Sequence, residues 1–167
     1  MTANLNTAEK AMLLSNEKLS AGVYAAQPQG FFADIVSCAS VLEFEKKILF
    51  LKKAPGKWSE NLWGIPCGTV DANDNDIYTT RARELKEEIG FKVQVSDLQC
   101  LGKLFIIQNE GVCNIHHVFY CEIHRDISIK LSAEHTDYKW LSKKEWSSVD
   151  FIPYQENVLS QFKIFAN

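Results

Sequence analysis

One stretch of the sequence decides how the rest is interpreted: Arg83-Glu84-Leu85-Lys86-Glu87-Glu88-Ile89-Gly90-Phe91. At about 100° per residue of an α-helix, Glu84, Glu87 and Glu88 share an arc of roughly 100°. The apolar side chains fall on a different side of the same helix, and they are Tyr78, Ala82, Leu85 and Ile89. We therefore predict an amphipathic helix whose apolar stripe packs on the core and whose acidic arc faces away from it.

The predicted helix runs from about residue 76 to residue 89 and ends at Gly90, which adopts the left-handed conformation at little cost. Its carboxylates repel one another by a few tenths of a kcal/mol per pair. They also crowd the last turns, at the negative end of the helix dipole. A divalent cation such as Mg²⁺, which prefers oxygen ligands, would remove both penalties. A solvated acidic face is the simpler interpretation, and the helix geometry alone leaves both open.

The segment upstream of this helix begins with Trp63-Gly64-Ile65-Pro66-Cys67-Gly68 and continues through the polar run 71–76. Together with the helix it resembles the signature of the Nudix hydrolases, a glycine-led loop followed by a helix that ends in R-E-x-x-E-E-x-G. The match spans residues 63–91, and the predicted strand order from 33 to 141 is compatible with the family's fold. The matching residues at the end of the helix are Arg83, Glu84, Glu87, Glu88 and Gly90.

The resemblance implies a fold, a reaction and a set of site residues. The fold is of the α/β class, a single-domain α/β/α sandwich with a mixed β-sheet. The reaction is hydrolysis of a pyrophosphate bond in a nucleoside diphosphate linked to another group, with Mg²⁺ or Mn²⁺ as the cofactor. Glu84, Glu87, Glu88 and the Gly68 carbonyl match the metal ligands. Glu84 and Glu87 are also assigned catalytic roles, together with Arg83, which matches the residue that orients the glutamates through salt bridges.

Two departures from the family signature are visible. The family carries a Glu six residues after the second Gly and eight before the Arg, whereas here Asp74 lies six residues after Gly68 and nine before Arg83. The loop therefore has one extra residue and a shorter acid, and we expect it to be reshaped. Cys67 stands where the first of two glycines is common, so the backbone there has to accommodate a side chain.

A catalytic base often comes from a later loop in this family. Glu134, with Trp140 six residues further on, resembles an acid-then-Trp pattern of some members and is our candidate for that base. A loop carboxylate without a catalytic role is the alternative interpretation. Glu110 and Glu122 are weaker candidates for the same role.

Candidate substrate-binding residues also lie outside the signature. Lys52 and Lys53 end a predicted strand near the loop that leads into the motif, where they are able to hold phosphate as point charges. Phe32 is a candidate for stacking on a base, and the other aromatic candidates are Phe31, Trp58 and Tyr138. Packing in the core or at its rim is the alternative interpretation for each of them. His116 and His117 lie in an apolar strand and are expected to satisfy local hydrogen bonds rather than bind metal.

The sequence also predicts the elements that lie outside this helix. Residues 1–30 are predicted as an N-terminal helix to about Leu19 and a lead-in segment, and residues 31–167 as the Nudix hydrolase domain. Residues 35–42 and 48–51 are predicted as a hairpin. Residues 142–146 form a predicted short helix, and Pro153 opens a final one at its first helical position. The remaining predicted strands are 92–95, 100–107, 114–123 and 135–141.

Composition restricts the class of protein. The chain has 167 residues, is 46% hydrophobic and 23% charged, and carries a formal net charge of −3. These values favour one globular domain over a disordered chain and argue against stable binding to nucleic acid or an anionic membrane. Neither an export signal nor a membrane segment is recognisable. The five scattered cysteines suggest a reducing compartment, so we expect a cytoplasmic protein.

The acidity is concentrated in one segment. Residues 71–88 contain six acidic and three basic side chains, an excess equal to the net charge of the whole chain. A cation bound there would reverse the local sign of charge toward phosphate. A small nucleotide is therefore the expected partner, and the family resemblance makes a homodimer a candidate assembly.

Two other functions are compatible with the sequence. One is an enzyme like isopentenyl diphosphate isomerase, which uses the same scaffold with a catalytic Cys and a second His/Glu metal site. Cys67 lies in the motif, but no clear second ligand set is visible. The other is a non-catalytic Nudix-like nucleotide-binding module, which the altered loop suggests and the intact Arg83, Glu84, Glu87 and Glu88 argue against.

Overall fold

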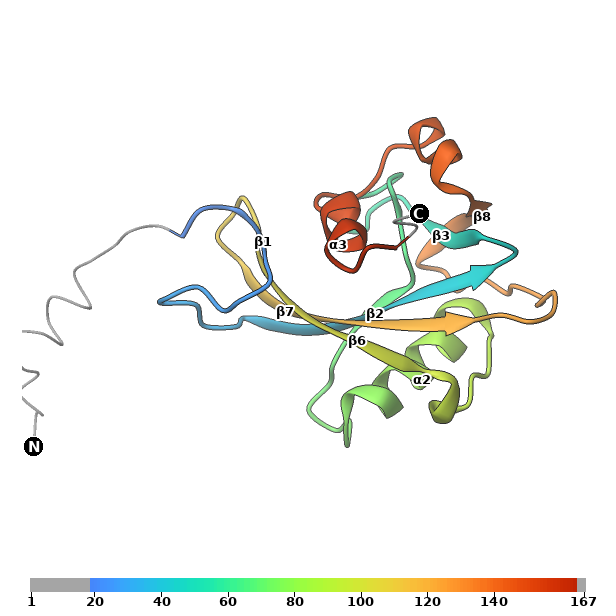
Figure 1. Cartoon of the computed structure of the whole chain (residues 1–167), viewed down its shortest axis with the longest axis horizontal. Coiled ribbons are helices and arrows are strands. Elements are labelled where there is room, and N and C mark those ends of the chain that lie inside the picture. Colours follow the sequence, from blue (N-terminus) through green and yellow to red (C-terminus); the bar gives the residue numbers. More distant parts are fainter. Residues whose placement is uncertain (1–18, 165–167) are drawn as a thin grey trace, which may run out of the picture.

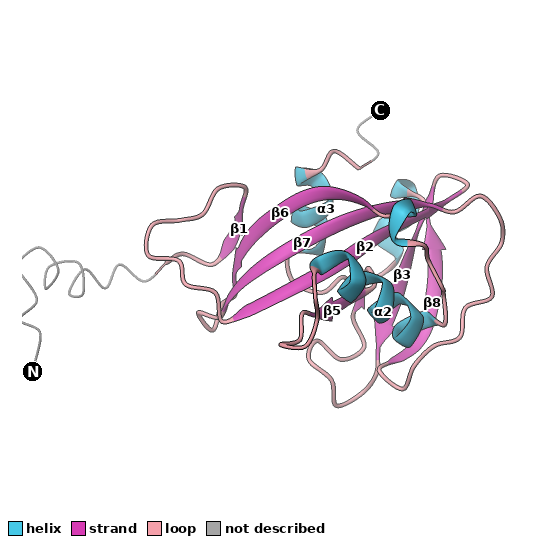
Figure 2. Ribbon diagram, turned by 90° about the horizontal axis from the view of Figure 1, so that it is seen from below, coloured by secondary structure: helices cyan, strands magenta, loops and turns pink. Residues whose placement is uncertain are grey.

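Strand β2 (Ile35–Phe44) lies at the centre of a sheet in which apolar runs are buried on both faces. The computed structural model describes residues 19–164. Figure 1 and Figure 2 show helix α2 on one face of the sheet and helix α3 on the other, which makes three layers. The predicted single-domain α/β/α sandwich is therefore confirmed.

The sheet contains eight strands in the order β1-β6-β7-β2-β3-β4, with β5 paired to β2 and β8 paired to β3. β2 and β7 are parallel, whereas the other strand pairs are antiparallel, so the sheet is mixed as predicted. The remaining strands are β1 (Gly22–Tyr24), β3 (Lys47–Lys53), β4 (Trp63–Gly64), β5 (Cys67–Thr69), β6 (Gln99–Ile107), β7 (Cys113–Glu122) and β8 (His135–Leu141).

Successive residues of the central strands enter two separate cores, because neighbouring side chains of a strand point to opposite faces. In β2, Ala39 and Val41 join the cluster on the side of α3 (Gln155–Gln161), whereas Cys38 and Leu42 join the cluster on the side of α2 (Ile77–Ile89). A strand covered on both faces is expected to be continuously apolar rather than alternating. The sequence of β2 has this character except at Ser37, Ser40 and Glu43, and the two serines are buried.

Helix α2 lies within one residue of the predicted bounds and ends at the predicted Gly90. The Asp76 side chain accepts hydrogen bonds from the backbone N–H groups of Tyr78 and Thr79, which caps the N-terminus. Gly90 has φ +71° and ends the helix in the left-handed conformation. The predicted stripe packs on the sheet through fully buried Leu85 and Ile89.

Three other predictions need correction, and a fourth falls almost wholly on residues that the structure does not describe. Residues 92–95 are not a strand: they are irregular and lead into the 3₁₀ helix η1 (Val95–Asp97). Pro153 does not open the last helix, which begins at Gln155 after Tyr154 in the left-handed region (φ +67°). The short helix predicted at 142–146 is the 3₁₀ helix η2 (Lys143–Ser148). The N-terminal helix predicted to about Leu19 falls almost wholly outside the described residues.

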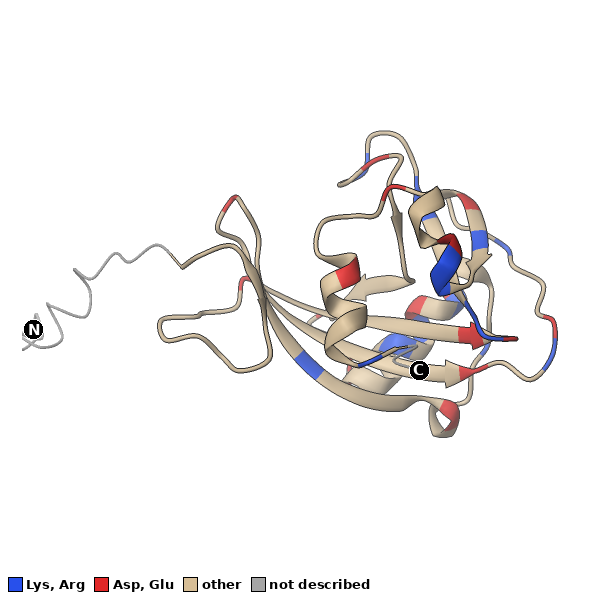
Figure 3. Ribbon diagram, turned by 45° about the horizontal axis from the view of Figure 1, so that its top comes forward, with Lys and Arg blue, Asp and Glu red and all other residues tan. Residues whose placement is uncertain are grey.

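Charged side chains are unevenly distributed along the sheet. Figure 3 shows few Lys, Arg, Asp and Glu residues around the β1 end of the ribbon and many toward the opposite end. Within residues 19–164, no helix is long and apolar enough to cross a membrane. All five cysteines are free thiols.

Candidate active site

An open, polar cavity lies between β5, the C-terminal half of α2 and the segment before β8. Its volume is about 550 Å³. It gathers side chains that are far apart in the sequence, since its lining includes Lys53 from β3 and Glu134 from the loop before β8. The other residues that line it are Cys67, Gly68, Thr69, Asp71, Arg83, Glu84, Glu87, Glu88 and Ser132.

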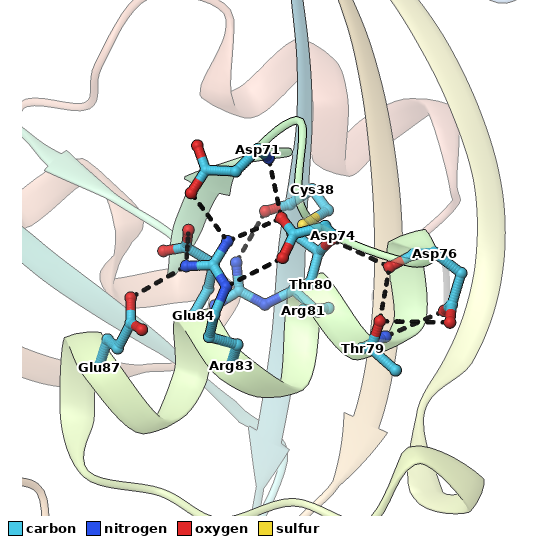
Figure 4. Close-up of polar contacts among 10 residues, drawn as sticks. All are labelled: Cys38, Asp71, Asp74, Asp76, Thr79, Thr80, Arg81, Arg83, Glu84 and Glu87. Atoms are coloured by element: carbon cyan, nitrogen blue, oxygen red, sulfur yellow. Dashed lines mark hydrogen bonds and ion pairs between the residues drawn. The ribbon is translucent and has the colours of Figure 1, made fainter.

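Arg83 lies at the centre of the acidic groups of this cavity. Its Nη1 donates to Glu84 Oε1 at 2.9 Å and to Glu87 Oε2 at 3.0 Å, one turn further along α2. Its Nε and Nη2 donate to the two oxygens of Asp74 at 3.1 and 2.8 Å. Figure 4 shows the guanidinium surrounded by these carboxylates and Asp71. The structure therefore places Arg83 where the resemblance put it, in salt bridges to the glutamates.

Asp74 reaches Arg83 despite the extra residue in the loop. The loop is tied by two hydrogen bonds, from Asp71 N to Asp74 Oδ2 at 2.8 Å and from Asp74 N to Asp71 O at 3.0 Å. The hydrogen bonds from Arg83 are the largest cause that lowers the pKa of Asp74 to about 2. Asp74 in turn holds the pKa of Arg83 above its usual range. Asp74 thus anchors Arg83 through a bidentate pair.

Glu84 lies directly against the backbone of Gly68. A Cβ atom added to Gly68 would overlap the Glu84 carboxyl group, so a glycine is required for this approach. The Glu84 side chain is 15% exposed, and burial raises its pKa. A partly desolvated carboxylate beside a backbone segment is an arrangement suited to a hard cation.

Glu88 does not face away from the core, which corrects our helical-wheel prediction. The residue is 3% exposed, and burial raises the pKa of its carboxyl group. Its Oε2 accepts from Arg81 Nη2 at 2.9 Å, and its Oε1 accepts from Cys67 N at 3.2 Å. The wheel was wrong here because α2 packs a second, polar face on β2 and β5 through the completely buried Arg81.

Glu134 lines the same cavity as the α2 carboxylates but comes from the loop before β8. Its Oε1 accepts from Lys57 Nζ at 2.9 Å, and this hydrogen bond lowers the pKa of Glu134. The backbone also fixes the loop, since Glu134 O accepts from Ala54 N at 2.9 Å. Glu110 and Glu122, the weaker candidates, do not line the cavity. The structure therefore brings Glu134 to the site in its charged form.

The predicted substrate-binding residues separate into two groups. Lys53 lines the cavity, but Lys52 does not, because neighbouring side chains of β3 point to opposite faces of the sheet. Phe32 is 84% exposed and lies outside the cavity. His116 donates to or accepts from Ser37 Oγ at 2.7 Å, as expected of a histidine that satisfies a local hydrogen bond.

A second, smaller cavity adjoins the first through Cys67 and is mainly apolar. Its volume is about 100 Å³, and Trp58 and Tyr154 stand on its lining with polar groups from Asn114 and Gln108. Burial raises the pKa of the Cys67 thiol to about 12, so the thiol is neutral at the junction of the two cavities. A neutral buried thiol is a poor nucleophile, which weighs against the isomerase alternative.

The carboxylate oxygens of the polar cavity are suitable ligands for a divalent cation, but they are not arranged as a ready metal site. Within residues 19–164, no three acidic, His or Cys side chains are arranged as a ready metal cluster. The carboxylates of Glu84 and Glu87 are held by Arg83 instead. They are still oxygen donors that face an open cavity beside Gly68, so a cation there would share them with Arg83.

A model of the NUDIX domain matches residues 32–162 of this sequence. The chain belongs to the Nudix family. The match extends well beyond the signature and includes every strand from β2 to β8. None of the curated proteins compared with this Nudix chain is significantly similar to it.

Solved structures of other Nudix proteins share the fold. A MutT protein from Methanosarcina mazei Go1 is 22% identical, with a TM-score of 0.66, over 80% of this chain and 95% of that one. The NUDIX domain of Shewanella oneidensis NrtR, complexed with ADP ribose, is 16% identical, with a TM-score of 0.67, over 86% and 95%. A bifunctional NMN adenylyltransferase/ADP ribose pyrophosphatase from Francisella tularensis, complexed with AMP and a Mn ion, is 14% identical, with a TM-score of 0.65, over 84% and 44%.

Several residues of this Nudix site were missed from the sequence. Arg81 lies seven residues before Glu88, which is two helical turns and therefore the same face, so the pair was detectable in principle. His135 is buried, and its Nε2 lies 3.8 Å from Glu88 Oε1. Lys57 pairs with Glu134 across 77 residues, and no local pattern signals a contact of that range.

Proposed function

We propose that this Nudix protein hydrolyses a pyrophosphate bond in a nucleoside diphosphate linked to another group, with Mg²⁺ or Mn²⁺ as its cofactor. The observation that carries the proposal is the cavity of about 550 Å³, which is lined by three acidic side chains and two basic ones: Glu84, Glu87, Glu134, Lys53 and Arg83. Acidic groups for a cation and basic groups for phosphate oxygens lie together there. The ADP ribose, AMP and Mn ion in similar Nudix structures support a nucleotide and a divalent cation as the ligands.

Each residue of the polar cavity has a separate role in the proposed reaction. We propose Glu84, Glu87 and the Gly68 carbonyl as ligands of the metal. A bound divalent cation supplies charge neutralisation, substrate orientation and activation of water. Arg83 keeps the two glutamates in position from one side, and Lys53 offers a point charge to phosphate. Glu134, which lines the same cavity, is proposed to accept the proton of the attacking water.

The neighbouring apolar cavity indicates how the nucleotide is oriented in the site. Its lining by Trp58 and Tyr154 suits a base or another planar group, with Asn114 and Gln108 available for hydrogen bonds. The two cavities meet at Cys67, so a ligand that spans both would place its phosphates beside α2.

A substrate panel tests the proposal. The purified chain is incubated with Mg²⁺ or Mn²⁺ and nucleoside triphosphates, ADP-ribose, nucleotide sugars, dinucleoside polyphosphates or 5′-triphosphate RNA, and phosphate-containing products are measured. We expect turnover of at least one member. Turnover of none, with metal present and ligand binding retained, would instead indicate a non-catalytic binding module.

Substitution of Glu87 links that turnover to the cavity. Glu87→Gln removes a metal-binding charge from an exposed side chain (59% exposed), so we expect kcat to fall about 100-fold while the fold is retained. Glu122→Gln, at the end of β7 and outside the cavity, is the matched control and should keep the wild-type rate. Unchanged turnover in Glu87→Gln would remove Glu87 from the site.

Glu134 is tested separately, because its role is independent of the metal ligands. Glu134→Gln keeps the shape of the side chain and its contact to Lys57 but cannot accept a proton. General base catalysis typically contributes about 10²–10⁴-fold, and we expect a loss of kcat in that range with unchanged Mn²⁺ affinity. A wild-type rate would assign the base to another residue.

A further inference from the structure

Arg81 is the most unusual charged residue of α2. It is completely buried, and its guanidinium reaches two groups on different elements. Nη1 donates to Cys38 O on β2 at 2.7 Å, and Nη2 donates to Glu88 Oε2 at 2.9 Å. Burial of a guanidinium is costly unless it is paired and hydrogen-bonded. Arg81 therefore depends on Glu88 for its only ionic partner among the described residues.

Both carboxylate oxygens of Glu88 accept hydrogen bonds from protein donors. One of its oxygens accepts from Arg81, and the other accepts from Cys67 N at 3.2 Å. Its side chain is 3% exposed, whereas those of Glu84 and Glu87 are 15% and 59% exposed. Of the three glutamates, Glu88 is thus the one whose charge is neutralised inside the protein. Glu84 and Glu87 are held by Arg83, which is itself partly exposed and has further carboxylate partners.

We propose that the Arg81 guanidinium takes the place of a metal ion at Glu88, so that the metal of this site is held by Glu84, Glu87 and Gly68 without Glu88. A cation that bound Glu88 strongly would compete with Arg81 Nη2 and leave a buried guanidinium without its ionic partner, which is unfavourable. This inference rests on the proposed metal-dependent function. It corrects one of the four ligand positions that the family resemblance implies.

The pair also joins α2 to its neighbouring strands, although Glu88 itself stands on the cavity lining. Arg81 ties α2 to β2 through Cys38 O, and Glu88 ties α2 to β5 through Cys67 N. Gly68 follows Cys67 directly, and the Glu84 carboxyl group rests against Gly68. Arg81 and Glu88 therefore tie α2 to β2 and β5. The Glu84 carboxylate is held separately by Arg83, so it does not depend on this pair.

The test removes both charges at once. In Arg81→Met/Glu88→Leu, no buried charge is left unpaired, and replacement of a buried ion pair by apolar side chains of similar volume is often tolerated. Mn²⁺ binding to the full-length chain without substrate is measured by titration with electron paramagnetic resonance. We expect an affinity within about threefold of wild type and the same number of bound ions, whereas Glu84→Gln should bind at least tenfold more weakly. Circular dichroism establishes that each variant is folded.

A loss of Mn²⁺ affinity in the folded double variant as large as that in Glu84→Gln would overturn the inference. A measurement on the wild-type chain covers the case in which the double variant does not fold. Crystals soaked in Mn²⁺ should show anomalous density at Glu84 and Gly68 and none within about 2.5 Å of a Glu88 oxygen. Mn²⁺ bound to Glu88 would overturn the inference and leave the proposed hydrolysis standing. Wild-type protein that binds no Mn²⁺ and turns over no substrate would overturn both.

Discussion

At the scale of single residues, the site depends on what one guanidinium can do. Arg83 donates from three nitrogens to Asp74, Glu84 and Glu87. Arginine presents its donors in a rigid, planar fork, whereas lysine is a compact point charge on a flexible stem. Only the fork is able to bind both oxygens of Asp74 and still reach the two glutamates of α2. The arrangement of the acidic groups therefore requires arginine and not merely a positive charge.

We predict that Arg83→Lys lowers kcat/KM about 10–100-fold, because the glutamates lose their common donor while the charge is retained. Steady-state kinetics at saturating Mg²⁺ measure the change. Lys86→Arg, three residues further along the same helix and exposed, makes an equally small change outside the site and should leave kcat/KM unaltered. Equal kinetics in Arg83→Lys and the wild type would show that the fork geometry is unimportant.

The sequence and the structure point to different aromatic residues for stacking on the nucleotide base. The sequence favours Phe32, whereas the structure favours Trp58. Trp58 is 56% exposed and lines the apolar cavity, whereas Phe32 is 84% exposed and lies on neither cavity lining. Stacking of a base on an aromatic side chain contributes about 1–3 kcal/mol. We therefore predict that Trp58→Ala raises KM about tenfold with little change in kcat, as expected for loss of uniform binding.

Phe32→Ala is the matched comparison for Trp58→Ala. Both variants remove a large exposed ring, but only one of them removes it from a cavity, so Phe32→Ala should retain the wild-type KM. The opposite result, a raised KM in Phe32→Ala alone, would support the assignment made from the sequence and remove the apolar cavity from substrate binding.

At the scale of elements, α2 was predictable because its signals are local. Asp76 begins the helix, Gly90 ends it, and Leu85 and Ile89 repeat on one face, all within one short segment. The wrong strand at 92–95 shows the limit of such reasoning, because strand preference depends on cross-strand neighbours. Residues 92–95 pair with no strand of the described sheet. The burial of Arg81 and Glu88 was also missed from the sequence. A helical wheel shows both residues as polar and does not show that they pair with each other inside the protein.

The N-terminal cap gives a prediction that belongs to the helix. Asp76 accepts from two backbone N–H groups that have no partner within the helix. We predict that Asp76→Ala lowers the free energy of unfolding by about 1 kcal/mol, measured by urea denaturation. Asp76→Ser keeps a capping oxygen and should recover most of that loss. An Asp76→Ala protein as stable as wild type would mean that α2 is held by packing alone.

At the scale of the whole molecule, the sheet separates two cores that hold different polar groups. The α2 side contains the Arg81–Glu88 pair, and the other face buries His116 against Ser37 on the neighbouring parallel strand. Long-range contacts of this kind depend on strand order. The parallel pairing of β2 with β7 follows from no local pattern, although the apolar character of both strands predicted that they would be buried.

His116 makes the stability of the whole molecule dependent on pH. Burial is the largest cause that lowers the pKa of its imidazole from 6.5 to about 4. The unfolded chain therefore binds a proton below pH 6.5 that the folded chain does not bind until about pH 4. The contribution is constant above pH 6.5, and stability falls as the pH is lowered through this window. Between pH 7.5 and pH 5 the loss from His116 alone is about 2 kcal/mol.

We predict that His116→Gln, which keeps a hydrogen-bonding group beside Ser37 but cannot titrate, reduces the acid-induced loss of stability by about 2 kcal/mol. Urea denaturation of wild type and variant at pH 7.5 and pH 5 measures the difference. His124→Gln removes an imidazole whose side chain is 79% exposed and should follow the wild-type profile. If wild type and His116→Gln lose the same free energy on acidification, then the His116 imidazole takes up its proton without unfolding. In that case solvent or a hydrogen-bond acceptor beside β7 stabilises the charged ring in the folded protein.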